Sequence, residues 1–235
     1  MKTIGIIGGM SWESSLEYYK LLNKLTQNKL GGFHSCKCIM YSVDFSEIEI
    51  LQRNGEWDQI AEKMIMISKR LEDAGAELLI IASNTIHKVS EKIEKHISIP
   101  FLHIADTTGE EVSRIGLKKV GLLGTKFTME ENFYRARLLE KYGIKTIIPS
   151  SSERELLQHI IFNELVAGII NEISKRKLKR IIDNLMMEGA EGIILGCTEL
   201  PLLINEKDTT SLLFNTTLLH GRAAIEFALR ERTLA

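Results

Sequence analysis

The chain alternates between short apolar runs and longer segments in which apolar residues recur at helical spacing. Residues 3–8 and 36–45 are largely apolar, and residues 77–82 are apolar after the first position. Runs without polar alternation are typical of strands that are covered on both faces. These three segments therefore predict strands, and residues 77–82 predict one that is covered on both faces.

Amphipathic segments lie between these runs. Residues 11–29 carry a helical period, and residues 57–74 place one apolar stripe along a helix, formed by Ile60, Met64, Ile67 and Leu71. The same alternation resumes after Lys118. Strands that alternate with helices predict an α/β fold with parallel sheets.

Two segments of the first half recur in the second half, in the same order and at nearly the same spacing. Residues 3–9 (TIGIIGG) resemble residues 119–125 (KVGLLGT), and residues 74–82 (AGAELLIIA) resemble residues 188–196 (EGAEGIILG). Gly-apolar-apolar-Gly pairs recur in parallel strands by composition alone. The shared Gly-Ala-Glu sequence before the second pair favours two copies of one fold.

The repeat predicts two pseudo-symmetric lobes, each a parallel-sheet α/β sandwich. We expect residues 1–114 to form the N-terminal lobe, joined by a C-terminal helix at 218–235, and residues 115–217 to form the C-terminal lobe. Ligands of parallel sheets bind beyond the carboxyl ends of the strands. We therefore expect the active site in the cleft between the lobes.

The predicted strands end in small polar residues. One end carries residues 83–85 (SNT), its repeat carries residues 197–199 (CTE), and two further ends carry residues 8–11 (GGMS) and 124–125 (GT). Turns of this kind present backbone N–H groups and positive helix ends, which suit a carboxylate ligand.

A cleft with Ser83 and Cys197 on opposite sides suits racemisation. The reaction removes a proton from one face of an α-carbon and returns one to the other, so it needs two acid/base groups. A thiol is a plausible base, because its pKa is about 8.5 and a helix N-terminus can lower it. Hydrogen-bond donors near the substrate carboxylate would stabilise the developing enediolate charge.

Composition excludes several other classes of protein. The 235 residues carry a formal net charge of -1, with 44% hydrophobic and 26% charged residues. This balance does not suit a nucleic-acid partner. We expect no membrane association, because no apolar stretch approaches the roughly 20 residues of a membrane span, and we expect a cytoplasmic protein, because no signal peptide is apparent.

The sequence also argues against a cofactor or a metal. Gly8-Gly9 lacks the spacing of a dinucleotide-binding motif, no P-loop is present, and no lysine has an obvious Schiff-base setting. Cys36 and Cys38 fall on one face of a strand, but His34 is the only further ligand nearby. We therefore interpret this pair as structural and expect neither cofactor nor metal.

Several motifs together resemble the aspartate/glutamate racemase superfamily. They are GGMSWES at residue 8, NTIH at residue 84, GCTE at residue 196, SVDF at residue 42, QR-x-GEW at residue 52 and LGT at residue 123. They span nearly the whole chain in the order of the family. The first and the QR-x-GEW motifs look most like the broad-specificity L-aspartate/L-glutamate racemase subgroup.

The resemblance implies a cofactor-independent racemase that interconverts L- and D-aspartate or glutamate, and a homodimer. Cys197 matches the family's second catalytic cysteine, and Ser83 occupies the position of the first. The substrate would contact Met10, Gln52 from a mobile loop, Asn84, Thr85, Thr125 and Thr198. Glu164 and His87 are possible neighbours, and His87 would either orient Ser83 or cap a helical turn.

Ser83 departs from the family pattern, because a hydroxyl is far less acidic than a thiol. In the L-selective subgroup a threonine, also a hydroxyl, replaces the first cysteine. Ser83 would then give a natural enzyme biased toward one enantiomer, or it is an engineered substitution that traps substrate. The family's Phe-Asp-Thr segment reads Phe214-Asn215-Thr216 here, so no carboxylate role is assigned at Asn215.

Two other functions stay open. A related cysteine-dependent isomerase or decarboxylase of the same superfamily would use the same scaffold. A protein that binds dicarboxylic amino acids without turning them over would also fit, because Ser83 stands where a thiol is expected.

Overall fold

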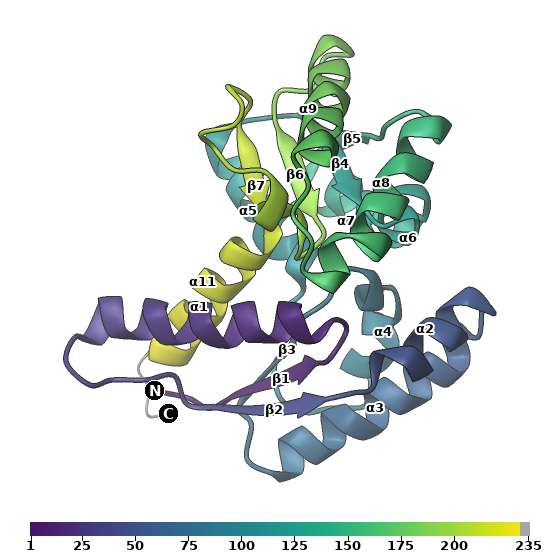
Figure 1. Ribbon diagram of the computed structural model, residues 1–235. Helices are drawn as coiled ribbons and strands as arrows, with labels where there is room; N and C mark the ends of the chain where they lie inside the picture. The colour runs from purple at the N-terminus through teal and green to yellow at the C-terminus, as the bar shows by residue number, and fades with distance from the viewer. Residues whose placement is uncertain (231–235) are drawn as a thin grey trace. The chain divides into compact units, whose positions relative to one another are not determined.

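The computed structural model describes residues 1–230, which divide into two compact units. Unit 1 contains Met1–His103 and residues 220–230, and unit 2 contains Ile104–Leu219. Figure 1 shows both units as layers of helices around strands. Within the described residues, no helix is long and apolar enough to cross a membrane.

Unit 1 is built on a parallel sheet with the strand order β2-β1-β3. The strands are β1 (Ile4–Gly8), β2 (Cys38–Ser42) and β3 (Leu78–Ile81). The helices up to His103 are α1 (Trp12–Leu30), α2 (Phe45–Arg53), α3 (Trp57–Asp73), the 3-10 helix η1 (Thr85–Val89) and α4 (Ser90–Glu94).

Strands β1 and β3 of unit 1 are buried on both faces because their apolar residues alternate between two helical layers. Ile4 and Ile6 pack with α1 and with residues of α11 (Thr216–Leu229), whereas Ile7 packs with α3. Leu78 and Leu79 divide between the same two layers. The apolar runs without polar alternation thus form fully covered strands, as the sequence predicts.

The second predicted strand is shorter than residues 36–45. Strand β2 ends at Ser42, and the Asp44 side chain accepts a hydrogen bond from the Ser46 backbone N–H at 3.0 Å. A side-chain oxygen at this position caps the first turn of a helix. Helix α2 therefore begins at Phe45, inside the segment expected to be extended.

Unit 2 repeats this arrangement and adds an edge strand. Its parallel sheet has the order β5-β4-β6-β7. The strands are β4 (Lys119–Gly124), β5 (Lys145–Ile147), β6 (Ile193–Gly196) and β7 (Leu213–Asn215). The helices are α5 (Ile104–Ile115), α6 (Lys126–Glu130), α7 (Asn132–Tyr142), α8 (Ser151–Asn163), the 3-10 helix η2 (Leu165–Ala167), α9 (Glu172–Met187), α10 (Leu200–Leu203) and the start of α11.

The repeated sequence segments occupy equivalent strands. In unit 1 the segment at 3–9 forms β1, which lies between β2 and β3, and in unit 2 its repeat forms β4, which lies between β5 and β6. The second pair of segments forms β3 and β6. The prediction of an α/β fold with two similar parallel-sheet lobes is confirmed.

The boundary between the units differs from the expected one at residue 114. Helix α5 belongs to unit 2, because Ile104, Ala105 and Val112 pack in one apolar cluster with Val120 and Leu122 of β4. Helix α11 begins in unit 2 and continues in unit 1, where Ala224, Ile225 and Ala228 join the core. The rest of the helix expected over 218–235 lies outside the described residues.

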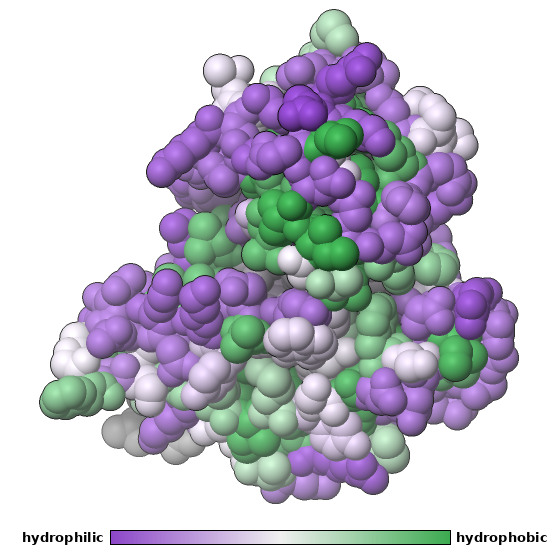
Figure 2. Space-filling view, in the orientation of Figure 1, coloured by the Kyte–Doolittle hydropathy of each residue, from purple (hydrophilic) through white to green (hydrophobic). Residues whose placement is uncertain are grey.

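The surface of both units is mixed in polarity. Figure 2 shows hydrophilic residues over most of the drawn face of each unit, with apolar groups between them. Ile169, Ile170 and Ile173 are about half exposed, at 51%, 50% and 55%. Scattered apolar exposure of this kind is normal for a folded domain.

His220 anchors the last segment of unit 1. Its Nε2–H donates to the Leu102 carbonyl at 2.9 Å, because a carbonyl can only accept. Its Nδ1 therefore accepts from the Tyr18 hydroxyl at 2.8 Å. The ring is fully buried, and burial lowers the pKa of His220 to about 4. The folded state thus holds this imidazole neutral.

Unit 1 should lose stability as the pH falls from 6.5 toward 4. The unfolded chain takes up a proton on His220 below its ordinary pKa of 6.5, whereas the folded chain does not until about pH 4. At about pH 5 this proton lowers the free energy of unfolding by about 2 kcal/mol. Urea unfolding followed by tryptophan fluorescence would measure it, because Trp12 and Trp57 both lie in unit 1.

His220→Gln is the matched control. The variant is expected to be less stable at pH 7 but to lose less stability between pH 7 and pH 5 than the unsubstituted chain. Equal losses in the two proteins would show that His220 does not carry the effect.

Candidate active site

The turn after β1 is closely packed. The Gly9 N–H donates to Ser15 Oγ at 2.7 Å, and Gly9 has a φ of +92°. A Cβ at Gly9 would lie 2.2 Å from the Val43 carbonyl oxygen, so only glycine fits this approach to the segment after β2. Ser11 then caps α1 by accepting from the Ser14 N–H at 3.3 Å.

Met10 connects this turn with two other predicted site elements. Its side chain is buried in one apolar cluster with Ile48 of α2 and Ile86 of η1. Gln52 lies in the last turn of α2, and η1 follows Ser83. Met10 therefore packs in the same cluster as residues of the helix that carries Gln52 and of the 3-10 helix that follows Ser83.

The family resemblance implies that Gln52 lies in a mobile loop, but the structure places it in a helix. It belongs to helix α2 and is only 6% exposed. Ile48 lies one turn earlier on the same helix and is fully buried, which explains why this face of α2 points inward. The amide is thus held by a packed helix.

Ser83 follows β3 at its carboxyl end. Ser83, Asn84 and Thr85 are all buried, and the preceding Ala82 N–H donates to the Ile7 carbonyl at 2.9 Å. His87 Nδ1–H donates to the Ser83 carbonyl at 2.7 Å, and the imidazole is 1% exposed. This contact with the carbonyl four residues earlier fits both predicted roles of His87, the orientation of Ser83 and the capping of a helical turn.

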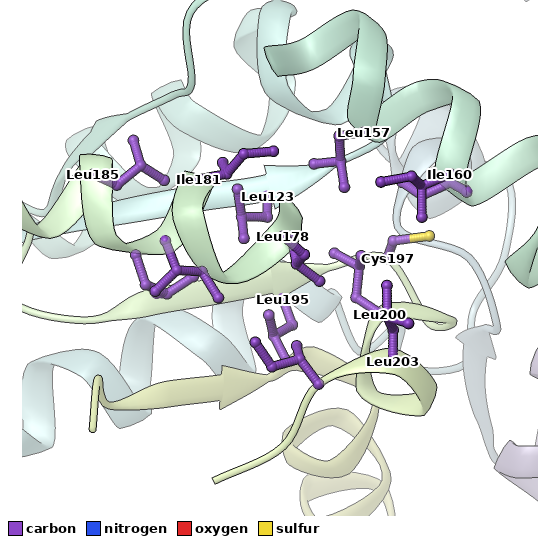
Figure 3. Close-up of a cluster of buried hydrophobic side chains, with 14 of the residues drawn as sticks. Leu123, Leu157, Ile160, Leu178, Ile181, Leu185, Leu195, Cys197, Leu200 and Leu203 are labelled. Atoms are coloured by element: carbon purple, nitrogen blue, oxygen red, sulfur yellow. The ribbon is translucent and has the colours of Figure 1, made fainter. Parts of the chain in front are cut away.

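Cys197 follows β6 at the equivalent place in unit 2. Its thiol donates to Glu199 Oε2 at 2.9 Å, and the Thr198 hydroxyl donates to the same oxygen at 2.8 Å. All three residues are less than 9% exposed. Figure 3 shows the Cys197 side chain among buried apolar residues, near the labelled Ile160 and Leu200.

The surroundings of Cys197 keep its thiol protonated. Burial raises the pKa of Cys197 well above its usual value, and the negative charge of Glu199 and the hydrogen bond to it raise it further. Backbone N–H groups of Glu199 and Leu200 lower the pKa by less. The position of Cys197 before a predicted helix suggests that the helix end lowers its pKa. The direction is the opposite, because burial and the adjacent carboxylate outweigh the backbone N–H groups.

Two threonines, Thr125 and Thr198, lie just after strand ends of unit 2. Thr125 follows β4 and caps α6, where its hydroxyl accepts from the Thr128 N–H at 3.3 Å. Gly124 and Gly196 are paired across β4 and β6, and a Cβ on Gly124 would lie 2.7 Å from the Gly196 carbonyl oxygen. Thr125 and Cys197, which follow this pair, therefore begin at the same edge of the sheet.

Glu164 lies beside the same region. It ends α8, and the next residue, Leu165, packs in one cluster with Cys197. Its Oε1 accepts from the Ser174 hydroxyl at 2.9 Å, whereas its buried Oε2 has no hydrogen-bond partner among the described residues. The Glu164 carboxylate thus has one buried oxygen without a hydrogen bond among the described residues, and it precedes a residue of the apolar cluster that contains Cys197.

Sequence reasoning missed the role of Glu199. Glu199 belongs to the GCTE motif, but the sequence alone assigns it no function. In the structure its carboxylate accepts the hydrogen bond from the Cys197 thiol. The carboxylate two positions after the cysteine is the sequence signal that could have identified it.

Among residues 1–230 no group of three His, Cys, Asp or Glu residues could hold a metal ion.

A model of the Asp/Glu/hydantoin racemase family matches residues 7–225, nearly the whole chain. The chain belongs to this family. The match includes both strand-end turns, with Ser83 in one and Cys197 in the other. The resemblance inferred from the sequence motifs is therefore confirmed.

Solved structures of this family share the fold. A Yersinia pestis protein named provisionally as an Asp/Glu racemase is 47% identical, has a TM-score of 0.91, and is aligned over 98% of this chain and 100% of its own. An aspartate racemase homologue from Pyrococcus horikoshii OT3 is 38% identical, with a TM-score of 0.85 over 98% of this chain and 100% of its own.

A curated relative is matched over a shorter region. The glutamate racemase of Sulfurihydrogenibium sp. (strain YO3AOP1) is 28% identical over 135 residues, which are 55% of this chain and 48% of that protein. The chain thus spans about half the length of this racemase. The two solved structures share the fold of this chain over nearly its whole length.

Glu199→Gln should lower the pKa of Cys197, because the substitution removes the negative charge that raises it but keeps a hydrogen-bond acceptor. A pKa change of one unit alters the thiolate fraction about tenfold. We expect Cys197 to be alkylated by iodoacetamide about tenfold faster in the variant at pH 8, as measured by peptide mass spectrometry.

The control is Glu206→Gln, which removes an exposed loop carboxylate of the same unit. An unchanged alkylation rate in Glu199→Gln would show that the carboxylate does not govern the thiol.

Proposed function

We propose that the protein is an amino-acid racemase that interconverts the enantiomers of aspartate or glutamate without a cofactor. Membership of the Asp/Glu/hydantoin racemase family supports this proposal. The observation that carries it is the buried Cys197–Glu199 pair at the carboxyl end of β6. A thiol hydrogen-bonded to a carboxylate is an acid/base unit suited to exchange a proton with a carbon acid.

In the proposed reaction Cys197 acts on one face of the α-carbon. As a base, it first passes its thiol proton to Glu199 Oε2, and the resulting thiolate removes the α-proton. As an acid, the neutral thiol donates its proton to the carbanion. The raised pKa of Cys197 favours this second role in the state described, because it keeps the thiol protonated.

Ser83 is proposed to act on the opposite face. Its hydroxyl can donate or relay a proton but is a weak base at neutral pH, whereas a thiol could do both. This asymmetry supports a preference for one enantiomer. The His87 contact to the Ser83 carbonyl would keep the turn in one orientation.

The substrate carboxylates are proposed to bind at the strand-end turns. Asn84, Thr85, Thr125 and Thr198 supply polar side chains there, and the turns supply backbone N–H groups. Met10 and Gln52 would complete the contacts from unit 1. Donors placed at a carboxylate stabilise the enediolate-like charge that forms when the α-proton leaves.

Two alternatives use the same residues differently. A related isomerase or decarboxylase would also need Cys197 as an acid. A binding protein would need the polar turns but no proton transfer, and the serine at position 83 supports that alternative. The homodimer, the cytoplasmic location and the choice between aspartate and glutamate stay predictions.

The activity is tested by hydrogen exchange at the α-carbon. We expect deuterium from heavy water to replace the α-proton of at least one enantiomer of aspartate or glutamate, as followed by proton NMR. Cys197→Ala should lower the exchange rate by at least about 1,000-fold, because a positioned acid/base group contributes 10²–10⁴-fold or more.

Each outcome separates the alternatives. Tight binding of any of the four amino acids without exchange would favour the binding protein. Exchange that persists in Cys197→Ala would show that Cys197 is not the acid/base group. Exchange with loss of carbon dioxide from a malonate would point to the decarboxylase.

Ser83→Cys should widen the enantiomer range. A thiol at position 83 supplies a base on the second face, so exchange of the enantiomer that reacts slowly in the unsubstituted chain should rise by about 10-fold or more. Ser83→Ala is the matched control and should not show this rise. Equal rates for the two enantiomers in the unsubstituted chain would contradict the proposed asymmetry.

A further inference from the structure

Cys36 and Cys38 form a pair of thiols far along the chain from Cys197, at the amino end of a strand. Cys38 is the first residue of β2 and pairs with Ile4, the first residue of β1. The Ser83 turn follows the other, carboxyl end of this sheet. The proposed racemase chemistry uses neither of these two thiols.

The backbone around the pair is held on both sides. The Cys36 N–H donates to Asn23 Oδ1 of α1 at 3.0 Å, and the Lys37 carbonyl accepts from the Ile4 N–H at 2.9 Å. Cys36 is buried and Cys38 is half-buried, and both belong to the apolar cluster between the sheet and α1. The two cysteines therefore stay next to each other in the folded chain.

The two side chains lie on one side of the chain. Residues i and i+2 of an extended segment face the same side, and both cysteines belong to the apolar cluster between the sheet and α1. The Cys36 thiol donates to the carbonyl of the intervening Lys37 at 3.6 Å. A strand rises about 3.3 Å per residue, which places the two α-carbons about 6.6 Å apart. This separation lies at the upper end of the range that a disulfide spans, so a bridge would form under strain and reduce readily.

The two thiols differ in reactivity. The hydrogen bond from Cys36 lowers the pKa of Cys38 to about 7, whereas that contact and burial raise the pKa of Cys36 far above its usual value. The thiolate is the reactive form of cysteine. Cys38 is thus the nucleophile of the pair, and Cys36 is the buried partner.

We propose that Cys36 and Cys38 form a redox-sensitive dithiol, which low-molecular-weight disulfides such as oxidised glutathione convert to an intramolecular disulfide. The Cys38 thiolate attacks one sulfur of the oxidant, a mixed disulfide forms, and one glutathione thiolate leaves. Cys36 then loses its proton to solvent and attacks the Cys38 sulfur, which releases the second glutathione thiolate. The protein loses two electrons and two protons, and the oxidant becomes two thiols.

Cys197 provides an internal comparison. Its thiol is 6% exposed, hydrogen-bonded to Glu199 and protonated because its pKa is raised. Cys36 and Cys38 belong to unit 1, whereas Cys197 belongs to unit 2 and follows a different strand. Selective oxidation of the Cys36–Cys38 pair is therefore expected while Cys197 stays reduced.

The test treats the full chain with oxidised glutathione at pH 7.5, blocks free thiols with iodoacetamide and maps the peptides by mass spectrometry. We expect the peptide that holds Cys36 and Cys38 to lose two hydrogen masses and to take up no alkyl group. The Cys197 peptide should remain alkylated. Dithiothreitol should restore both alkylation sites.

Two variants follow the order of the steps. Cys36→Ser should stop at a glutathione adduct on Cys38, and Cys38→Ser should react at least tenfold more slowly than the unsubstituted chain. A glutathione adduct that persists in the unsubstituted chain, oxidation of Cys197 before this pair, or no reaction at any cysteine would each overturn the proposal. These results are independent of racemase activity, which the α-proton exchange measures separately.

Discussion

The burial of the central strands on both faces is the constraint on which the rest of the structure depends. Ile4, Ile6 and Ile7 of β1 are fully buried, as are Leu122 and Leu123 of β4. A strand that is covered on both sides can present polar groups only where it ends. Along its length the backbone forms hydrogen bonds with the neighbouring strands, and the side chains pack against the helices. Ser83 and Cys197 follow such ends, and this explains why candidate chemistry concentrates in short turns.

Much of this arrangement could be predicted from the sequence. The apolar runs without alternation gave β1, β3, β4 and β6, since strand burial leaves a direct trace in residue type. The end of β2 could not be read in the same way. Phe45 continues the apolar pattern, but the local cap at Asp44 decides the structure there. Helix α5 was likewise assigned to the wrong lobe, because its partner strand β4 comes later in the chain.

The candidate site was predictable in position but less so in electrostatics. The motif around Cys197 marked the turn, yet the rise in its pKa depends on burial and on the direction of the Glu199 carboxylate, which neighbouring residue types do not fix. The family resemblance implies a mobile loop at Gln52, whereas the residue lies in helix α2, whose Ile48 is buried. The sequence shows that Ser83 and Cys197 differ in residue type, but the protonation of Cys197 depends on its structural surroundings.

Unit 1 is assembled from two stretches of chain that are separated by all of unit 2. The face of its sheet that receives Ile4 and Ile6 is completed by Ala224, Ile225 and Ala228 of α11. Unit 2 has all its strands within residues 104–219. During synthesis on the ribosome, all segments of unit 2 are therefore available for folding before unit 1 is complete. The apolar face of the N-terminal sheet stays uncovered by α11 until that helix has been synthesised.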